Sequence, residues 1–348
     1  MSRRAPAIVA AAVVVAVLLV AAFGAGRVYE RLGGLDGLVA VVADIHAGGR
    51  DRADRRGHRD DTADRVPSRA ARRRDEAASL ERLRREIDDL APQRPGHPDL
   101  FVLGIAGDGS EQVFLNEVNH LRALAAGRLD ARGHVLLLAN HAPAAPAAAP
   151  VPATRATVRA ALAAIGDAMD PAEDILLLYA TTHGSQDHWL LLRRDGWPDA
   201  TLDAPALRRA LDDAGIRHRV LVLSACYSGG LADALATPDT LFLAAARADR
   251  PSFGCGTSSV ATFFGRAWLV DALNSTVDFA EAFRRARAAI AMREAAVGEA
   301  ASYPQMRAGE RIGATLAGWR AAFAPGPPVP YPFAEPGYAA DASASSSR

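Results

Sequence analysis

From residue 99 onward, short uninterrupted apolar runs alternate along the chain with longer stretches of helical periodicity. A continuous apolar run is typical of a strand that is buried on both faces. The alternation therefore predicts an α/β fold in which helices cover both faces of a mostly parallel central sheet. The apolar runs lie at residues 100–105, 135–138, 175–180, 189–192, 220–223 and 241–245. The helical stretches lie at residues 113–124, 154–169, 204–214, 262–273 and 279–297.

Length and charge set wide limits on this domain. The chain has 348 residues, with 40 basic and 40 acidic side chains and a formal net charge of zero. One domain of roughly 200 residues with extensions fits this length, and we place it at residues 99–320. The balanced charge gives no electrostatic reason to expect a nucleic-acid partner. The two cysteines, Cys226 and Cys255, are too few for a disulfide framework or a structural zinc site.

The N-terminal part of the chain carries a membrane signal. Two arginines within the short segment 1–4 precede an uncharged apolar run at residues 5–26, and roughly 20 such residues can span a bilayer as a helix. A cleaved signal peptide is the alternative, because the small residues at 21–25 offer a cleavage site. The first interpretation predicts a single-pass membrane protein whose large domain is exported, and the second predicts a secreted protein.

Two further segments have compositions that do not favour a packed core. Residues 27–98 are dense in Arg and Asp from residue 47 onward, which predicts a charged linker or a loose, partly helical stalk. Within it, residues 81–90 have the charge spacing of a solvated helix face. Residues 325–348 are rich in Pro and then in Ala and Ser, so we expect a disordered tail.

Two apolar runs end in residues that can carry chemistry. Residues 175–180 lead through two threonines into His183 and Gly184, and residues 220–223 lead into Cys226 among small residues, where a helix is expected to begin. In an open α/β sheet, ligands bind at the carboxyl ends of the strands. If the two strands are parallel neighbours, His183 and Cys226 emerge side by side at that edge.

This pair of residues has the chemistry of nucleophilic catalysis. A thiolate is the nucleophile, and a neighbouring imidazole and a helix N-terminus both favour it over the thiol. The imidazole can then protonate a leaving amine. Gly184 and the small residues around Cys226 let backbone N–H groups approach a developing oxyanion, and losing one such donor typically costs about 3 kcal/mol of barrier. Either residue alone is more often structural, so the indication rests on their joint position at strand ends.

Other enzyme classes fit the chain less well. In α/β-hydrolases the catalytic histidine follows the nucleophile, whereas no histidine follows His218 here. The turn at residues 104–109 does not match a dinucleotide-binding fingerprint, and the histidines lack metal-binding spacing, so we expect neither a cofactor nor a metal. Cys255 is interpreted as a buried thiol, and Trp268 and Trp319 as core residues.

Five ordered segments between residues 99 and 316 carry a family resemblance. They are Thr182-His183-Gly184, Ser224-Ala225-Cys226-Tyr227-Ser228-Gly229, Ala244-Ala245-Ala246-Arg247-Ala248-Asp249, Ser252-Phe253-Gly254-Cys255 and Tyr303-Pro304-Gln305. Together they resemble the bacterial branch of the C13 peptidases, the legumain family.

This resemblance implies the three-layer caspase–legumain fold and a cysteine endopeptidase that hydrolyses peptide or protein substrates through a thioester acyl-enzyme. It implies His183 and Cys226 as the catalytic dyad, with backbone N–H groups of Gly184 and Cys226 as the oxyanion hole. With the N-terminal anchor, it implies a bacterial inner (cytoplasmic) membrane protein.

The specificity pocket departs from the family pattern. Positions where plant and animal legumains hold asparagine with charged residues carry Phe114, Ser224 and Arg266 here, so asparagine specificity does not carry over. Ser252 matches the family's pocket serine, and Gln112 falls near the family's histidine-orienting asparagine. The family also includes the transamidase that attaches lipid anchors. A transamidase or ligase with the same dyad is therefore an alternative function, and a non-catalytic membrane-anchored scaffold is another.

Overall fold

The structure of the protein is a computed structural model that describes residues 67–141, 150–256 and 259–333. The predicted membrane anchor at residues 5–26 lies outside these ranges, as does most of the predicted linker. Within the described ranges, no helix combines the length and the apolar character that crossing a membrane requires. The anchor and the exported location therefore stay predictions.

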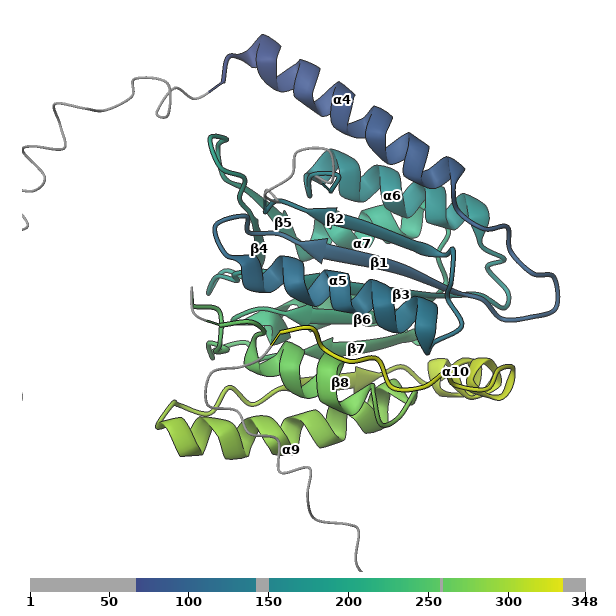
Figure 1. The fold of residues 1–348 in the computed structure, drawn as a ribbon, viewed down its shortest axis with the longest axis vertical. Coiled ribbons are helices and arrows are strands. Elements are labelled where there is room, and N and C mark those ends of the chain that lie inside the picture. Colours follow the sequence, from purple (N-terminus) through teal and green to yellow (C-terminus); the bar gives the residue numbers. More distant parts are fainter. Residues whose placement is uncertain (1–66, 142–149, 257–258, 334–348) are drawn as a thin grey trace, which may run out of the picture. The chain divides into compact units, whose positions relative to one another are not determined.

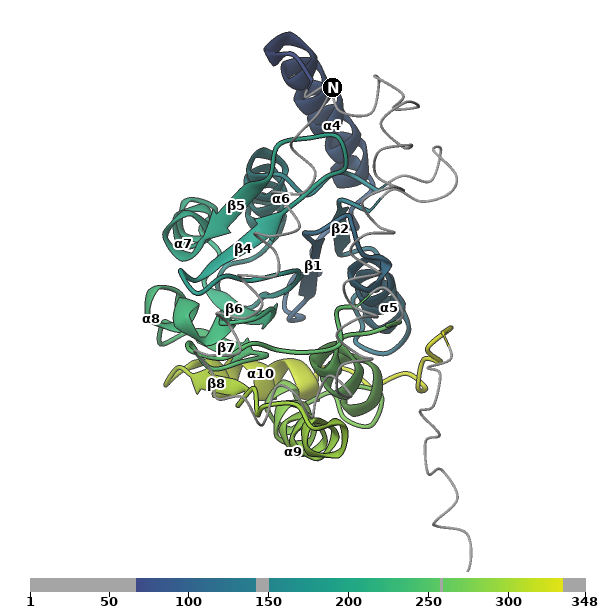
Figure 2. The same ribbon diagram turned by 90° about the vertical axis from the view of Figure 1, so that its left-hand side faces the viewer.

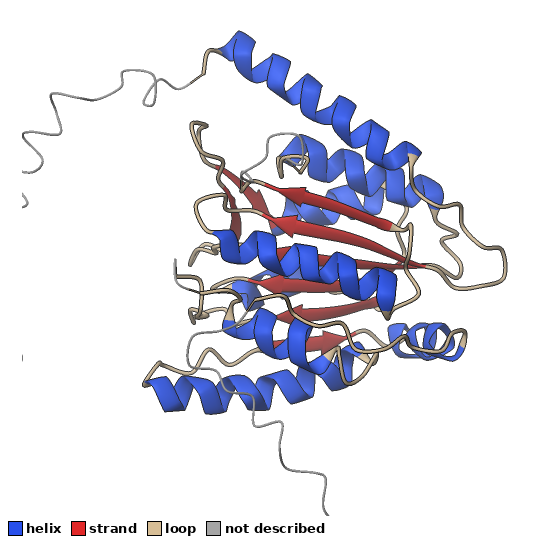
Figure 3. Ribbon diagram, viewed as in Figure 1, coloured by secondary structure: helices blue, strands red, loops and turns tan. Residues whose placement is uncertain are grey.

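A six-stranded sheet forms the centre of the domain, with its strands in the order β2-β1-β3-β6-β7-β8 (Figure 1). The first five strands are parallel, and β8 at the edge is antiparallel. Figure 3 shows the arrowheads of the parallel strands on one side of the sheet. The prediction of a mostly parallel sheet is confirmed. The strands span Val135–Ala139 (β2), Leu100–Ala106 (β1), Ile175–Thr181 (β3), His218–Ser224 (β6), Thr240–Ala244 (β7) and Gln305–Ala308 (β8).

Helices cover both faces of this sheet, which gives three layers (Figure 2). One face carries α5 (Gln112–Gly127), η3 (Gly265–Ala272), α9 (Phe279–Val297) and α10 (Ile312–Ala321). The other face carries α4 (Arg69–Asp88), α6 (Arg155–Ala168), α7 (Ala204–Asp213) and α8 (Ala232–Leu235).

Side-chain caps explain where several of these helices begin. Thr154 accepts a hydrogen bond from the backbone of Thr157 and starts α6, while Asp203 does the same for α7. Asp278 accepts from two backbone N–H groups at the start of α9. Each such cap is typically worth about 1 kcal/mol, because it satisfies an N–H group that the helix leaves unpaired.

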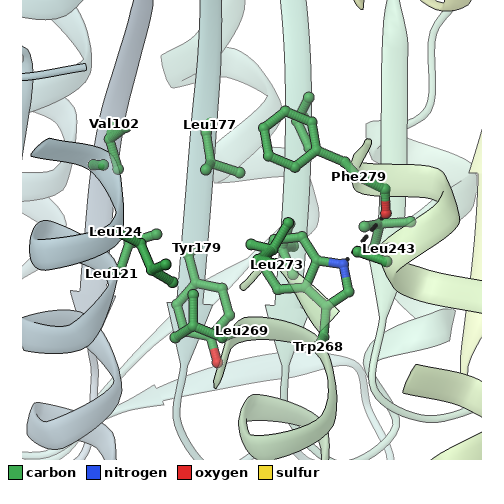
Figure 4. Close-up of a cluster of buried hydrophobic side chains, with 14 of the residues drawn as sticks. Val102, Leu121, Leu124, Leu177, Tyr179, Leu243, Trp268, Leu269, Leu273 and Phe279 are labelled. Atoms are coloured by element: carbon green, nitrogen blue, oxygen red, sulfur yellow. Dashed lines mark hydrogen bonds between the residues drawn. The ribbon is translucent and has the colours of Figure 1, made fainter. Parts of the chain in front are cut away.

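The apolar core lies on both faces of the sheet because successive strand residues point to opposite sides. Val102 and Leu177 face α5 and η3, where Trp268 fills the centre of the cluster (Figure 4). The Trp268 indole stacks against the ring of Tyr179 at 5.9 Å and donates from Nε1 to the backbone oxygen of Phe279 at 3.4 Å. Trp268 and Trp319 are both buried, so their interpretation as core residues is confirmed.

The structure differs from the sequence-based expectations at both flanks of the domain. Helix α4 lies in the stretch expected to be a linker or stalk, and Leu83 is 1% exposed in the core. Its Arg84 forms exposed ion pairs, so the solvated face predicted at 81–90 is present as well. Residues 325–333 of the expected disordered tail pack on the domain, where Val329 forms two hydrogen bonds with Asn274. The compact unit therefore extends beyond both ends of residues 99–320.

Two strands, β5 and β8, are not revealed by the apolar pattern of the chain. The predicted run at 189–192 forms β4 (Trp189–Leu192), which pairs with β5 (Ala200–Asp203) in a separate two-stranded sheet. Edge strand β8 is short and half exposed, so it carries no continuous apolar run.

Candidate active site

Strands β3 and β6 are adjacent and parallel, and the register pairs Thr181 with Ser224. Both strands therefore end together, and His183 and Cys226 follow at the carboxyl edge that faces the viewer in Figure 2. The two following loops also touch. A Cβ atom added at Gly184 would lie 2.1 Å from the carbonyl oxygen of Cys226, so only glycine fits there. The sequence-based condition for bringing His183 and Cys226 to one edge is met.

The thiol of Cys226 lies against Ser252 in the loop after β7. Sγ is 3.4 Å from the carbonyl oxygen of Ser252 and 3.3 Å from its backbone nitrogen. The thiol can donate to the carbonyl, whereas a thiolate can accept from the N–H group and also from the Ser252 hydroxyl at 3.7 Å. Ser252 therefore satisfies both protonation states of Cys226. Within the described residues, Sγ forms no hydrogen bond with His183.

The backbone after Cys226 departs from the expected helix start. Tyr227 adopts a left-handed conformation with φ 57°, and a single 3₁₀ turn, η2 (Ser228–Leu231), follows before the short α8. So short a helix contributes little dipole at the thiol, because the effect comes from aligned peptide units. The backbone N–H group of Ser252, 3.3 Å from the sulfur, is instead the hydrogen-bond donor at the thiol. His188, also left-handed at φ 60°, packs its ring on Gly230 and holds the strained loop in place.

The imidazole of His183 is oriented by two carboxyl groups. Nε2 lies 3.3 Å from Oε1 of Glu111 and 3.8 Å from Oδ2 of the fully buried Asp108. The edge of the Phe114 ring packs on the imidazole at a centroid distance of 5.4 Å. These contacts occupy Nε2 and leave Nδ1 as the ring nitrogen that can meet a substrate.

Gln112 was predicted to orient His183, and the structure assigns this role to its neighbour. Gln112 is exposed at the first position of α5, whereas Glu111 precedes the helix and reaches the imidazole. A carboxylate stabilises a protonated imidazole more strongly than an amide does. Sequence position alone misses this by one residue, because the choice depends on where the helix begins.

Glu117 anchors the end of β3 directly and the end of β6 through Thr262, and nothing in its sequence context predicts this role. It lies in α5, is fully buried, and accepts hydrogen bonds at 2.7 Å from Tyr179, Thr181 and the backbone of Thr262. Thr262 in turn bonds Ser224, two residues before Cys226, at 3.1 Å. Burial raises the pKa of Glu117, and burial together with Glu117 raises the pKa of Tyr179 well above its usual range.

The pocket residues named from the family pattern have different surroundings. Phe114 and Ser224 are buried under the site, and the Ser224 hydroxyl is engaged by Thr262. Arg266 forms an ion pair with Asp271 at 3.1 Å. Ser252 is the member of the set that touches Cys226 directly.

Replacing Glu117 by glutamine is expected to change how stability depends on pH. The raised pKa means that the folded state holds the Glu117 proton more tightly than the unfolded state, whose value is near 4.5. The carboxyl group therefore costs stability progressively as pH rises above that value. Unfolding curves across this range should show a wild-type free energy of unfolding that falls relative to Glu117→Gln.

Glu81→Gln is the matched control for this comparison. Glu81 is exposed on α4, and the adjacent Arg84 lowers its pKa, which gives the opposite sign: Glu81 stabilises the fold above pH 4.5 and loses this effect as pH falls. If the difference in the free energy of unfolding between wild type and Glu117→Gln is constant with pH, the pKa of Glu117 does not change on folding.

A thiol and an imidazole at one sheet edge, with carboxylates behind the imidazole, are the parts of a cysteine-dependent hydrolase. The model of the peptidase C13 family matches residues 160–314, which include both His183 and Cys226. Over this part of the chain, the predicted resemblance to the C13 peptidases is confirmed.

Comparison with solved structures finds a similar fold in caspase-1 from Spodoptera frugiperda. The two share 13% sequence identity over 63% of this chain and 94% of that chain, with a TM-score of 0.42. Comparison with curated proteins finds no match.

Proposed function

We propose that this protein is a cysteine endopeptidase with Cys226 as nucleophile and His183 as general acid and base. The observation that carries the proposal is the loop contact at the sheet edge. Gly184 packs against the backbone of Cys226, and Ser252 donates its N–H group to the sulfur. This arrangement holds the sulfur of Cys226 and the imidazole of His183 on the same open edge. The side chain of His183 is 32% exposed, so a peptide can reach it.

The reaction follows from these positions. The Cys226 thiolate attacks the scissile carbonyl carbon, and the oxyanion that forms accepts hydrogen bonds from backbone N–H groups of Gly184 and Cys226. Protonated His183 gives its proton to the leaving amine, the C–N bond breaks, and a thioester remains on Cys226. Neutral His183 then takes a proton from water, which attacks the thioester and releases the acid product and the thiolate.

Glu111 and Asp108 serve this cycle by holding the imidazole of His183 in a fixed orientation. Their carboxyl oxygens lie 3.3 and 3.8 Å from Nε2, on the side away from the reacting nitrogen. His183 can therefore carry a proton to the leaving group without losing its orientation.

The pocket gives a further expectation about specificity. Phe114 is apolar, and the Ser224 hydroxyl is already bonded to Thr262. Neither offers the charged partner with which legumains hold asparagine. Profiling with a peptide library should yield internal cleavages in which asparagine is not enriched before the scissile bond. The cleavage should stop after thiol alkylation.

The same experiment separates hydrolysis from acyl transfer. An added amine competes with water for the thioester, so a transamidase would give amine-capped products, whereas the proposed peptidase gives mainly free carboxyl termini. Absence of internal cleavage across the library, or cleavage that persists after alkylation, would contradict the proposal.

A further inference from the structure

Three side chains of the kinds that bind transition metals meet beside the proposed dyad. Glu111 precedes α5, His183 follows β3, and Cys255 lies in the loop after β7. One carboxylate oxygen, one ring nitrogen and the sulfur of this trio all lie within 4.8 Å of one another. No other group of this kind occurs within the described ranges. The three residues are far apart in sequence, so only the fold brings them together.

The spacing of these atoms suits a tetrahedral zinc ion. Zinc lies about 2.0–2.2 Å from nitrogen and oxygen ligands and about 2.3 Å from sulfur, so tetrahedral ligands are separated by roughly 3.3–3.6 Å. The Glu111 oxygen and Nε2 of His183 are 3.3 Å apart. The sulfur of Cys255 lies within 4.8 Å of the other two ligand atoms, so a side-chain movement of roughly 1 Å brings it to the tetrahedral spacing.

The electrostatic surroundings also favour a cation. The second oxygen of Glu111 is buried and has no hydrogen-bond partner within the described part of the chain. Asp108 places another carboxyl oxygen 3.8 Å from Nε2, although Arg193 lies 3.4 Å from the same oxygen. Imidazole and thiolate ligands select zinc over magnesium and calcium, which prefer oxygen.

We infer that Glu111, His183 and Cys255 form a zinc-binding site whose occupation inhibits the enzyme. Zinc would replace the proton between Glu111 and His183 and the thiol proton of Cys255, and both protons would be released to solvent. No oxidation or reduction is involved. An imidazole with zinc on Nε2 cannot become the imidazolium that donates to the leaving amine, so general acid catalysis stops. The inhibition rests on the proposed peptidase function, whereas the binding does not.

Metal binding is tested first on the inactive Cys226→Ala protein. Titration with Co²⁺ should produce a sulfur-to-cobalt charge-transfer band in the near ultraviolet, and Zn²⁺ should abolish this band by displacement. With Cys226 absent, the sulfur must come from Cys255, the only other cysteine. The band should disappear in Cys226→Ala/Cys255→Ser and persist in Cys226→Ala/His97→Ala. His97 is the matched control because it bonds Asp130, outside the trio.

Inhibition is tested on the active enzyme with Zn²⁺ alone. Half-maximal inhibition, taken relative to each variant's own activity, should require at least about tenfold more zinc in Cys255→Ser and in Glu111→Gln. The inference is overturned if Cys226→Ala binds no zinc by calorimetry, or if Cys255→Ser leaves binding and inhibition unchanged. Zinc binding by a protein that cleaves no peptide would retain the site and reject the peptidase function, whereas binding without inhibition would reject the regulatory part.

Discussion

Cys226→Ala is expected to lower kcat for peptide cleavage by at least about 10⁴-fold, which is the scale seen when a covalent nucleophile is removed. The thioester cannot form without the sulfur, and the alanine methyl group has no nucleophilic lone pair. The carbonyl oxygen and the backbone N–H group of Ser252 both contact the sulfur, so Ser252 can bond Cys226 in either protonation state. Initial rates of cleavage of a peptide from the library profile give the measurement.

The folded state of Cys226→Ala provides the control for this loss. Cys226 is only partly buried, so its truncation should change the free energy of unfolding by less than about 1.5 kcal/mol. A variant that unfolds at the same denaturant concentration and has lost activity supports the nucleophile. A folded Cys226→Ala protein that retains a tenth or more of wild-type activity would reject it.

His183→Ala is expected to have the second largest effect, a loss of about 10²–10⁴-fold in kcat. The substitution removes the imidazole, which is both the acid that protonates the leaving amine and the base that activates water. Glu111 and Asp108 cannot substitute, because both face Nε2 rather than the reacting side of the ring. The measurement is kcat with the same peptide.

His97→Ala is the matched control for His183→Ala. His97 lies just before β1, at the amino end of the sheet, where it bonds Asp130 at 3.1 Å. Its replacement should leave kcat within about twofold, because a distant surface histidine does not touch the reacting atoms. Equal losses in the two variants would mean that His183 acts through stability rather than catalysis.

Much of the fold follows directly from the apolar pattern. Five of the six central strands contain a continuous apolar run, because a parallel strand in the middle of the fold is buried on both faces. The predicted helix at 279–297 coincides with α9, whose start and end carry an Asp278 cap and a left-handed Gly298. Strand β8 escaped prediction because an edge strand needs few apolar residues.

The placement of His183 and Cys226 at one edge of the sheet could also be predicted, since the two residues follow neighbouring parallel strands. The groups around this pair could not be predicted, because they depend on tertiary contacts. Glu111 orients His183 across 72 positions of sequence. Glu117 binds the end of β3 directly and reaches the end of β6 through Thr262. It lies in an amphipathic helix, where a single Glu resembles an ordinary surface residue. The trio of Glu111, His183 and Cys255 matches no zinc motif, since each ligand comes from a different segment.

Labelling with a thiol-reactive peptide electrophile tests the proposed dyad most directly. Mass spectrometry of the digested protein identifies which of the two cysteines reacts, and the time course gives the rate. Burial and the neighbouring Cys226 raise the pKa of Cys255 to about 11, which keeps it a poorly reactive thiol. We predict label on Cys226 and a rate that falls by about 10²-fold in His183→Ala. Label mainly on Cys255, or a rate that does not depend on His183, would contradict it.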